Sequence, residues 1–254
     1  IGVKASGANA GSLHLQIQYP EFVTYGEDWA RAYAPTLRFL SASIDMWKGL
    51  PCELEEELDV ALSGGLVVAM TDQQMRLIEA KARIEASVGV QTDILDSADV
   101  HSMAPYLTDK VVGAGFCARE GKANPLRVTP ALMQATLSAG VEIWRQTRVT
   151  AIERRSGGFD ISTTQGHFRA SRVVNCAGAA AAEIAAMVGF KVELSGFPLQ
   201  ATVTEPVAPT IPHLVYSAAG KLTLKQLANG GCVIGGGWSA AVRSDGSLTT
   251  DPSN

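Results

Sequence analysis

The sequence predicts an α/β fold that merges into an α+β arrangement. Short apolar strands alternate with helices through the middle of the chain, as in a doubly wound sheet covered by helices. Strand-rich stretches flank this middle part, which indicates a second layer or domain. The chain has 254 residues, of which 46% are hydrophobic, so it can bury one large core or two smaller ones.

The first predicted helix covers residues 27–50. Its apolar residues recur every three or four positions, and they are Trp29, Tyr33, Leu37, Leu40, Ile44 and Trp47. Pro35 lies within this stripe and cannot donate a helical hydrogen bond, so we expect a kink or a restart there. Residues 58–63 and 65–70 are short apolar runs separated by Gly64, and they predict two adjacent strands.

Capping residues predict the starts of the later helices. Thr71 can cap the next helix, with Gln74 completing a capping box, and Gly89 ends it. Thr129 and Pro130 are typical of an N-cap and a first helical position. The other predicted elements are a helix at 96–103 capped by Asp96, strands at 111–117, 141–144, 149–154 and 172–176, a hairpin at 159–170, a helix at 179–188, strands at 200–205, 214–216, 222–225 and 232–235, and an extended tail at 243–254.

Composition excludes several classes of partner. The net charge is −4, with 21 basic and 25 acidic residues and no basic block, so we expect no nucleic acid partner. No apolar run approaches the roughly 20 residues that span a bilayer, so we expect no transmembrane segment. The four cysteines are far apart and show no metal-ligand spacing. They favour the reduced core thiols of a cytoplasmic protein. We expect the protein to be peripheral to the inner membrane face at most.

Two segments are rich in small residues that let the backbone approach a ligand closely. Residues 5–11 read ASGANAG, which is typical of either a flexible tail or a loop against a ligand. Residues 173–189 run from a predicted strand through Ala-Gly into a helix of small residues. That pattern fits tight helix–sheet packing or an approach to a phosphate. No G-x-G-x-x-G occurs, and the glycines at 235–237 lack a following helix, so neither gives a dinucleotide fingerprint.

Polar side chains alternate along one predicted strand. Lys221, Thr223 and Lys225 would share a face, because side chains alternate across a strand. This face fits either the solvent side of an edge strand or a cationic wall for a substrate carboxylate.

Five segments occur in an order that resembles one known family. They are ASGANAG, GKANPLRVTPALMQATLSAGVEIWRQTRVTAIE, RVVNCAGAAAAEIAAMVG, GFPLQATVTEP and LTLKQLANGGCVIGGGW. The family is that of the FAD-dependent amino-acid oxidases and dehydrogenases of the D-amino-acid oxidase, glycine oxidase and sarcosine oxidase type. Within it, the segments look most similar to catalytic subunits of multi-subunit enzymes that act on proline, hydroxyproline, opines or sarcosine, which implies partner subunits.

This resemblance implies a Rossmann-like FAD domain, incomplete here, that is interleaved with a mixed-sheet substrate domain. Residues 1–48 and 118–192 would form the FAD domain, and residues 49–117 and 193–254 the substrate domain. The family's first glycine-rich βαβ unit would precede Ile1 and its closing segment would follow Asn254, so we expect a fragment. The implied reaction transfers hydride from a small amino acid, a primary or secondary amine, to FAD. The flavin then performs the chemistry, with no protein residue as catalyst.

The resemblance also implies the residues of the site. Cofactor contacts are expected at Ser6, Gly7, Ala8, Asn9, Ala10, Gly11, Val149, Cys176, Ala177 and Gly178, and substrate contacts at His14, Lys221 and Lys225. The alternative is a non-catalytic fragment, or an assembly subunit of such an enzyme, that does not hold FAD by itself. An NAD-type dehydrogenase is disfavoured by the missing fingerprint.

Overall fold

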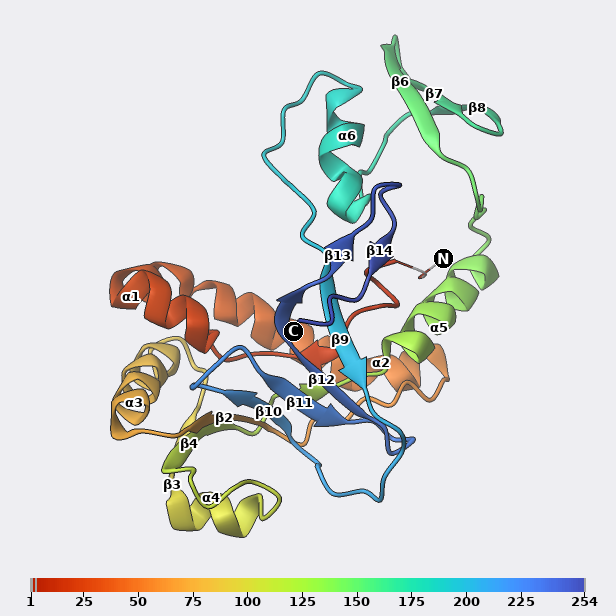
Figure 1. The fold of residues 1–254 in the computed structure, drawn as a ribbon. Helices are drawn as coiled ribbons and strands as arrows, with labels where there is room; N and C mark the ends of the chain where they lie inside the picture. Colours follow the sequence, from red (N-terminus) through yellow and green to blue (C-terminus); the bar gives the residue numbers. More distant parts are fainter. Residues whose placement is uncertain (1, 3, 254) are drawn as a thin grey trace. The chain divides into compact units, whose positions relative to one another are not determined.

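The computed structural model describes residues 2 and 4–253, so Ile1, Val3 and Asn254 of the predicted domains lie outside it. The chain forms two compact units (Figure 1). The larger unit comprises Gly2–Ala135 and Gln200–Trp238, and the smaller one Thr136–Leu199 and Ser239–Asp251. The predicted assignment of segments to an FAD part and a substrate part stays a prediction.

A seven-stranded mixed sheet organises the larger unit, in the order β3-β4-β2-β10-β11-β12-β9. Its strands are β2 (Gly65–Ala69), β3 (Asp93–Asp96), β4 (Gly113–Cys117), β9 (Leu199–Val203), β10 (Leu214–Ser217), β11 (Thr223–Gln226) and β12 (Cys232–Ser239). Strand β2 pairs with β10 in parallel and with β4 in antiparallel fashion. Strand β11 pairs antiparallel with both β10 and β12, so it lies inside the sheet. The predicted mixture of α/β and α+β character is thus confirmed.

Helices bury both faces of this sheet. The helices of the unit are α1 (Tyr19–Tyr33), α2 (Thr36–Leu54), α3 (Asp72–Ala86), α4 (Ser97–Met103) and α5 (Pro125–Ser138). On one face, Ile78 of α3 packs with Val67 and Leu214. On the other, Val100 of α4 packs with Leu66 and Val215. Strand β2 is buried on both faces, which explains why its sequence is continuously apolar instead of alternating. No helix in the described part of the chain has the length and apolar character needed to cross a bilayer.

Capping residues predicted the starts of α3 and α4 in this unit. The helix predicted at 27–50 is interrupted at Pro35, as expected, and becomes α1 and α2. Its predicted start is wrong, because α1 already begins at Tyr19, with Pro20 in its first turn. Thr71 accepts a hydrogen bond from the Gln74 backbone N–H (3.3 Å), and Asp96 caps α4 in the same way. All four cysteines are free thiols, but Cys52 and Cys176 are exposed, so the prediction of core positions is wrong for these two. Burial raises the pKa of Cys117 to about 11.

Two further predictions for this unit are wrong. Helix α5 begins at Pro125 and not at Thr129, because Asn124 accepts from the Leu126 backbone N–H (3.0 Å) and caps the helix earlier. Residues 58–63 do not form a strand beside β2. Only Ala61 makes a bridge, to Lys122 of β5 (Gly121–Lys122), and β5 pairs instead with β1 (Ser12–Leu13).

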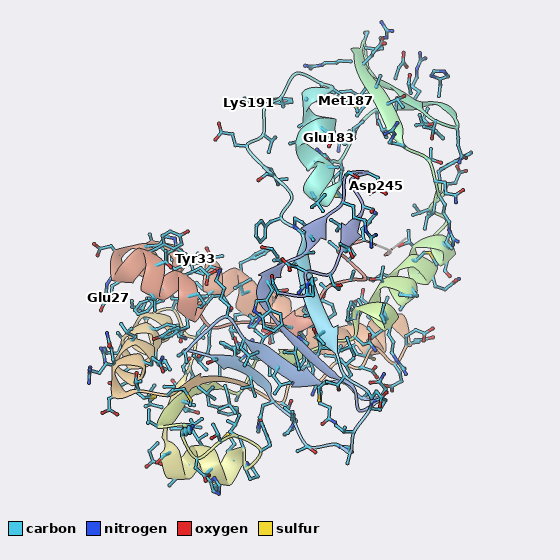
Figure 2. All side chains as sticks on the ribbon, viewed as in Figure 1. Glu27, Tyr33, Glu183, Met187, Lys191 and Asp245 are labelled. Carbon is cyan, nitrogen blue, oxygen red and sulfur yellow. The ribbon has the colours of Figure 1, made fainter. Side chains whose placement is uncertain are left out.

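The smaller unit contains a three-stranded antiparallel sheet of β6 (Val149–Arg155), β7 (Gly158–Thr163) and β8 (Gly166–Ala170). The predicted hairpin over 159–170 is therefore confirmed. The unit also holds the short helices η1 (Gly178–Ala180) and α6 (Ala181–Ala186) and the pair β13 (Ala241–Val242) and β14 (Leu248–Thr249). Figure 2 shows Glu183 on α6 and Asp245 in the turn between β13 and β14.

Four predictions differ from the structure of the smaller unit. The strand expected at 172–176 is absent from the described residues, because Asn175 bonds to the Ala177 N–H (3.2 Å) and the Ala181 carbonyl (2.8 Å). Such local side-chain bonds favour a turn over a strand. The helix expected at 179–188 is correspondingly short. No strand forms at 141–144, and the tail expected at 243–254 contains β14.

Packing between α3 and the sheet gives a stability prediction. Replacing the fully buried Ile78 in Ile78→Ala should lower the free energy of unfolding by about 2–5 kcal/mol, because it leaves a cavity against Val67 and Leu214. Urea unfolding followed by circular dichroism measures the change. The matched control is Phe39→Ala on α2, where the side chain is 76% exposed and the change should stay within about 0.5 kcal/mol. Equal losses for the two variants would contradict the assignment of this core.

Candidate functional site

A buried segment without regular structure lies at the centre of the larger unit. Residues 14–18 connect β1 to α1 and form neither helix nor strand. Leu15, Gln16 and Ile17 are nevertheless buried, with at most 2% of their surface exposed. Buried backbone N–H groups need hydrogen-bond acceptors, and this segment has no neighbouring strand to supply them. Side chains from other elements therefore have to do so.

Glu120 supplies the first set of acceptors. This residue is fully buried in the connection between β4 and β5. Its Oε1 accepts from the backbone N–H groups of Leu15 (2.6 Å) and Gln16 (2.7 Å). Its Oε2 accepts from the Gln16 side-chain amide (3.0 Å) and from the hydroxyl of Tyr216 (2.5 Å). Four donors thus surround one carboxylate.

Glu85 of α3 supplies the second set. It accepts from the Ile17 backbone N–H (2.7 Å) and the Thr92 hydroxyl (2.7 Å), and it forms an ion pair with Lys81 one helical turn away (2.6 Å). Lys81 also donates to the side-chain oxygen of Gln16 (3.0 Å). Both carboxylates therefore hold the same segment. We call these six residues the Gln16 cluster: Gln16, Lys81, Glu85, Thr92, Glu120 and Tyr216.

His14 lies beside the Gln16 cluster. Its ring packs edge-on against the ring of Tyr216, with centroids 5.2 Å apart and planes at 85°. Burial lowers the pKa of His14, which favours its neutral form. Its Nδ1 is the one buried side-chain nitrogen or oxygen that has no hydrogen-bond partner in the described residues. A buried polar atom without a partner is costly, so it is a good candidate to meet a ligand.

Lys225 is the second polar group of this region. It lies on β11, is 1% exposed, and donates to the Ser12 hydroxyl (2.5 Å). Burial and the nearby charge of Lys122 lower the pKa of Lys225 to about 8. No carboxylate of the described residues forms an ion pair with it. A buried ammonium group that lacks an anion can accommodate an anionic ligand.

The strand register places Lys225 on the same face as Tyr216. Tyr216 lies opposite Thr223, and Thr223 and Lys225 are two positions apart on β11. Because β11 is an interior strand, the interpretation of this face as a solvent-exposed edge is wrong. Lys221 precedes β11 and is exposed, so the structure does not bring it into the buried group.

The loop before β1 has a defined turn conformation. The Asn9 side chain donates to the carbonyls of Ala5 (3.0 Å) and Ser6 (2.8 Å), and its oxygen accepts from the Gly11 N–H (2.8 Å). A Cβ at Gly7 would lie 1.8 Å from the Gly2 carbonyl oxygen, and one at Gly11 would lie 2.1 Å from that of Ala123. Packing alone therefore requires two of the small residues, while the flavin contacts expected at residues 6–11 stay a prediction.

The predicted site residues fall into two groups. The loop at residues 6–11, His14 and Lys225 belong to the larger unit. Val149 and the exposed residues 176–178 belong to the smaller unit. Their assignment to the cofactor stays a prediction.

Sequence reasoning missed the Gln16 cluster. One signal was available, since Lys81 and Glu85 are spaced i, i+4 on the same side of the predicted helix as Ile78. A charged pair within an apolar stripe indicates a buried ion pair. Glu120 and Tyr216 gave no comparable signal, because they are 96 positions apart and meet only in the fold.

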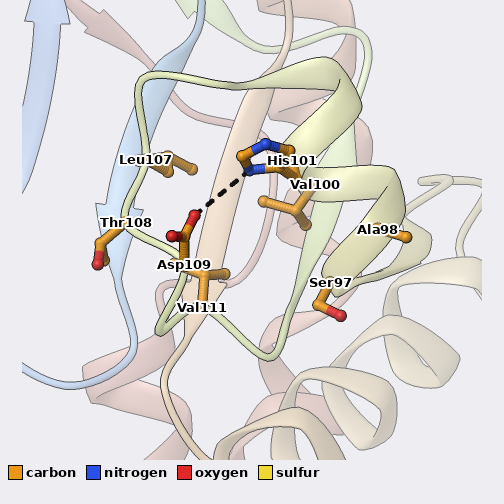
Figure 3. Close-up of a pocket in the computed structure, with 8 residues that line it drawn as sticks. All are labelled: Ser97, Ala98, Val100, His101, Leu107, Thr108, Asp109 and Val111. Carbon is orange, nitrogen blue, oxygen red and sulfur yellow. Dashed lines mark ion pairs between the residues drawn. The ribbon is translucent and has the colours of Figure 1, made fainter.

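A separate surface cavity lies beside α4 (Figure 3). His101 and Asp109 face each other there at 3.6 Å, with 62% and 93% of their side chains exposed. Exposed pairs of this kind contribute little binding or stability. No group of three or more potential metal-binding side chains occurs among the described residues. The buried polar region around His14 and Lys225 is therefore the candidate functional site.

The fold is the one used by flavin-dependent amino-acid oxidoreductases. Glycine oxidase from Geobacillus kaustophilus superposes with a TM-score of 0.82 over 97% of this chain and 66% of that protein, at 24% identity. L-proline dehydrogenase from P. horikoshii gives a TM-score of 0.76 over 85% of this chain and 59% of that protein, at 25% identity. These similarities show which fold the chain adopts.

Residues 1–253 match the sequence profile of the family described as FAD dependent oxidoreductase, and the chain belongs to this family. The family expected from the five sequence segments is thus confirmed. Sarcosine oxidase subunit beta from Rhizobium meliloti is 26% identical over 78% of this chain. The match covers 49% of that subunit, so the chain spans about half of its length.

The buried ion pair of the Gln16 cluster gives a second stability prediction. Lys81→Met should lower the free energy of unfolding by about 3–5 kcal/mol, because it leaves the Glu85 carboxylate buried without a cation. The double variant Lys81→Met/Glu85→Gln should lose less than the single variant, since no uncompensated charge remains. Urea unfolding curves of the three proteins measure both effects. A double variant that is less stable than Lys81→Met would contradict this account.

Proposed function

We propose that the protein oxidises the amine C–N bond of a small amino acid, a primary or secondary amine, with FAD as the oxidant. The observation that carries this proposal is the buried Lys225 ammonium, which has no carboxylate partner among the described residues and lies on the sheet face of the candidate site. Family membership supplies the cofactor. Bound FAD would provide the ring that accepts hydride from the substrate.

The residues present fit a flavin and an amino acid. The unpartnered Nδ1 of His14 lies three residues after Gly11, where the loop expected to face the flavin ends. Residues 6–11 would offer their backbone to the ribityl and ring part of FAD. Val149, Cys176, Ala177 and Gly178 would line the dinucleotide path.

Lys225 would bind the carboxylate of the substrate. Its ammonium group is protonated below a pH of about 8 and is held by Ser12, so its direction is fixed before the substrate arrives. An ion pair formed in this dry environment is stronger than one formed in water. The neutral His14 can accept a hydrogen bond at Nδ1 from the substrate amine or contact the flavin ring.

We extend the proposal to partner subunits. Sarcosine oxidase subunit beta is by its name one subunit of an assembly, and its sequence aligns with 78% of this chain. The competing function is that of an assembly subunit that does not hold FAD by itself.

Titration of the purified protein with FAD separates the two functions. An FAD-dependent enzyme should bind FAD at micromolar concentration or tighter and show the visible absorbance of a bound flavin. Adding glycine, sarcosine or proline without oxygen should then bleach this absorbance. A protein that stays colourless and cannot be reconstituted would rule out the proposed function and leave the assembly subunit.

The role of Lys225 gives a kinetic prediction. In Lys225→Met the KM for the amino acid should rise roughly 10–100-fold with a smaller change in kcat, because one charged hydrogen bond to the carboxylate is lost. In the unsubstituted protein, KM should rise as the pH increases through about 8, since deprotonation removes the charge of Lys225. Steady-state kinetics between a pH of about 6.5 and about 9.5 measure both effects on KM. This range extends roughly 1.5 pH units to either side of the pKa of Lys225.

A charge-matched control is Lys110→Met, which removes an exposed lysine from the connection between α4 and β4. Its KM and pH dependence should match those of the unsubstituted protein. If Lys225→Met also kept its KM, Lys225 would not bind the substrate carboxylate.

A further inference from the structure

The geometry points to Glu120 as a positioning residue that fixes His14 in the candidate site. This inference rests on the proposed function for its catalytic consequence, but the position of His14 can be tested without a bound flavin. Glu120 itself is fully buried and is surrounded by protein donors, so it acts through its neighbours and not by contact with a ligand.

The two oxygens of Glu120 hold His14 from two sides. Oε1 accepts from the backbone of Leu15 and Gln16, the two residues that follow His14 in the chain. Oε2 accepts from the hydroxyl of Tyr216, whose ring packs edge-on against the His14 ring. One carboxylate therefore fixes both the main chain next to His14 and the aromatic surface on which its imidazole rests.

The chemistry of the surrounding groups requires an acceptor on both sides. Two backbone N–H groups, one amide NH₂ and one hydroxyl all point at Glu120. A carboxylate accepts all four, whereas a glutamine would place its own NH₂ group against the NH₂ of Gln16. Glu120→Gln keeps the size of the side chain and therefore disturbs this arrangement through its hydrogen bonds and its charge, not through packing.

The sheet leaves space for this carboxylate at one glycine. A Cβ on Gly65 would lie 2.0 Å from Oε2 of Glu120 and 2.9 Å from its Cβ. Gly65 is the first residue of β2, and its carbonyl accepts weakly from Gln16 (3.4 Å). Its missing side chain is thus part of the same arrangement. Gly65→Ala would push the carboxylate away while keeping its charge.

Several charged groups act on the ionisation of His14. Burial lowers its pKa most, and Lys225 lowers it further. Glu120 and Glu21 act in the opposite direction and raise it. Removing the charge of Glu120 should therefore shift the pKa of His14 to a still lower value, which gives a signature that a general loss of stability does not produce.

The experiment compares Glu120→Gln with the unsubstituted protein by NMR titration of the ¹⁵N-labelled imidazole of His14. We expect the pKa of His14 to fall in the variant, together with a change in its ring chemical shifts at high pH. In the FAD-loaded enzyme, kcat should fall at least tenfold with a smaller change in KM. The acid limb of the kcat/KM profile should move to lower pH.

A second pair of variants keeps the test decisive if Glu120→Gln does not fold. Tyr216→Phe removes one hydroxyl donor from Glu120, and Thr92→Val removes one hydroxyl donor from Glu85. The two changes delete similar bonds to buried carboxylates, but only the first involves the ring that contacts His14. Tyr216→Phe keeps the charge of Glu120, so it should change the ring chemical shifts of His14 and lower kcat without the fall in pKa. Thr92→Val should change neither the ring shifts nor kcat.

Two results would overturn the inference. The first is an unchanged His14 titration in Glu120→Gln together with unchanged His14 ring chemical shifts in Tyr216→Phe. The second is a shifted titration with full kcat in an active enzyme, which would show that His14 moves without consequence. An unsubstituted protein that oxidises no amine refutes the proposed function alone, because the NMR titration still decides whether Glu120 positions His14.

Discussion

The fold of the larger unit depends on the hydrogen-bond acceptors of three consecutive buried backbone N–H groups. Leu15, Gln16 and Ile17 are buried outside any helix or strand, and the carboxylates of Glu120 and Glu85 take the place of a neighbouring strand. A buried N–H without an acceptor costs on the order of 1–3 kcal/mol, so this segment could not stay in place without them. The route of the chain from β1 to α1 follows from these hydrogen bonds.

This arrangement explains why so much polarity is tolerated in the core. Gln16 connects both carboxylates, and Lys81 offsets the charge of Glu85. A buried polar network is favourable only when its members are satisfied, and the described members of the Gln16 cluster all have partners. The two polar groups left for a ligand, His14 and Lys225, lie at the side of the cluster. The side chains that stabilise the fold are thus different from the side chains that can bind a ligand.

Short sequence patterns correctly predicted the helix starts and breaks that depend only on neighbouring residues. Caps at Thr71 and Asp96 gave the starts of two helices, and the proline at position 35 gave the break between α1 and α2. The same reasoning failed where a nearby side chain offered the backbone a competing hydrogen bond. Asn124 starts α5 before Thr129, and Asn175 turns the chain where an apolar run predicted a strand.

Periodicity, capping and the order of short segments were enough to predict the fold class, most strands of the larger sheet and the family. The burial of Lys225 on an interior strand and the contact between Glu120 and Tyr216 could be seen only in the folded chain. Burial and partners of a polar side chain depend on residues far away in the chain, so no local pattern encodes them. The chemistry of the candidate site therefore became visible only when distant segments were brought together.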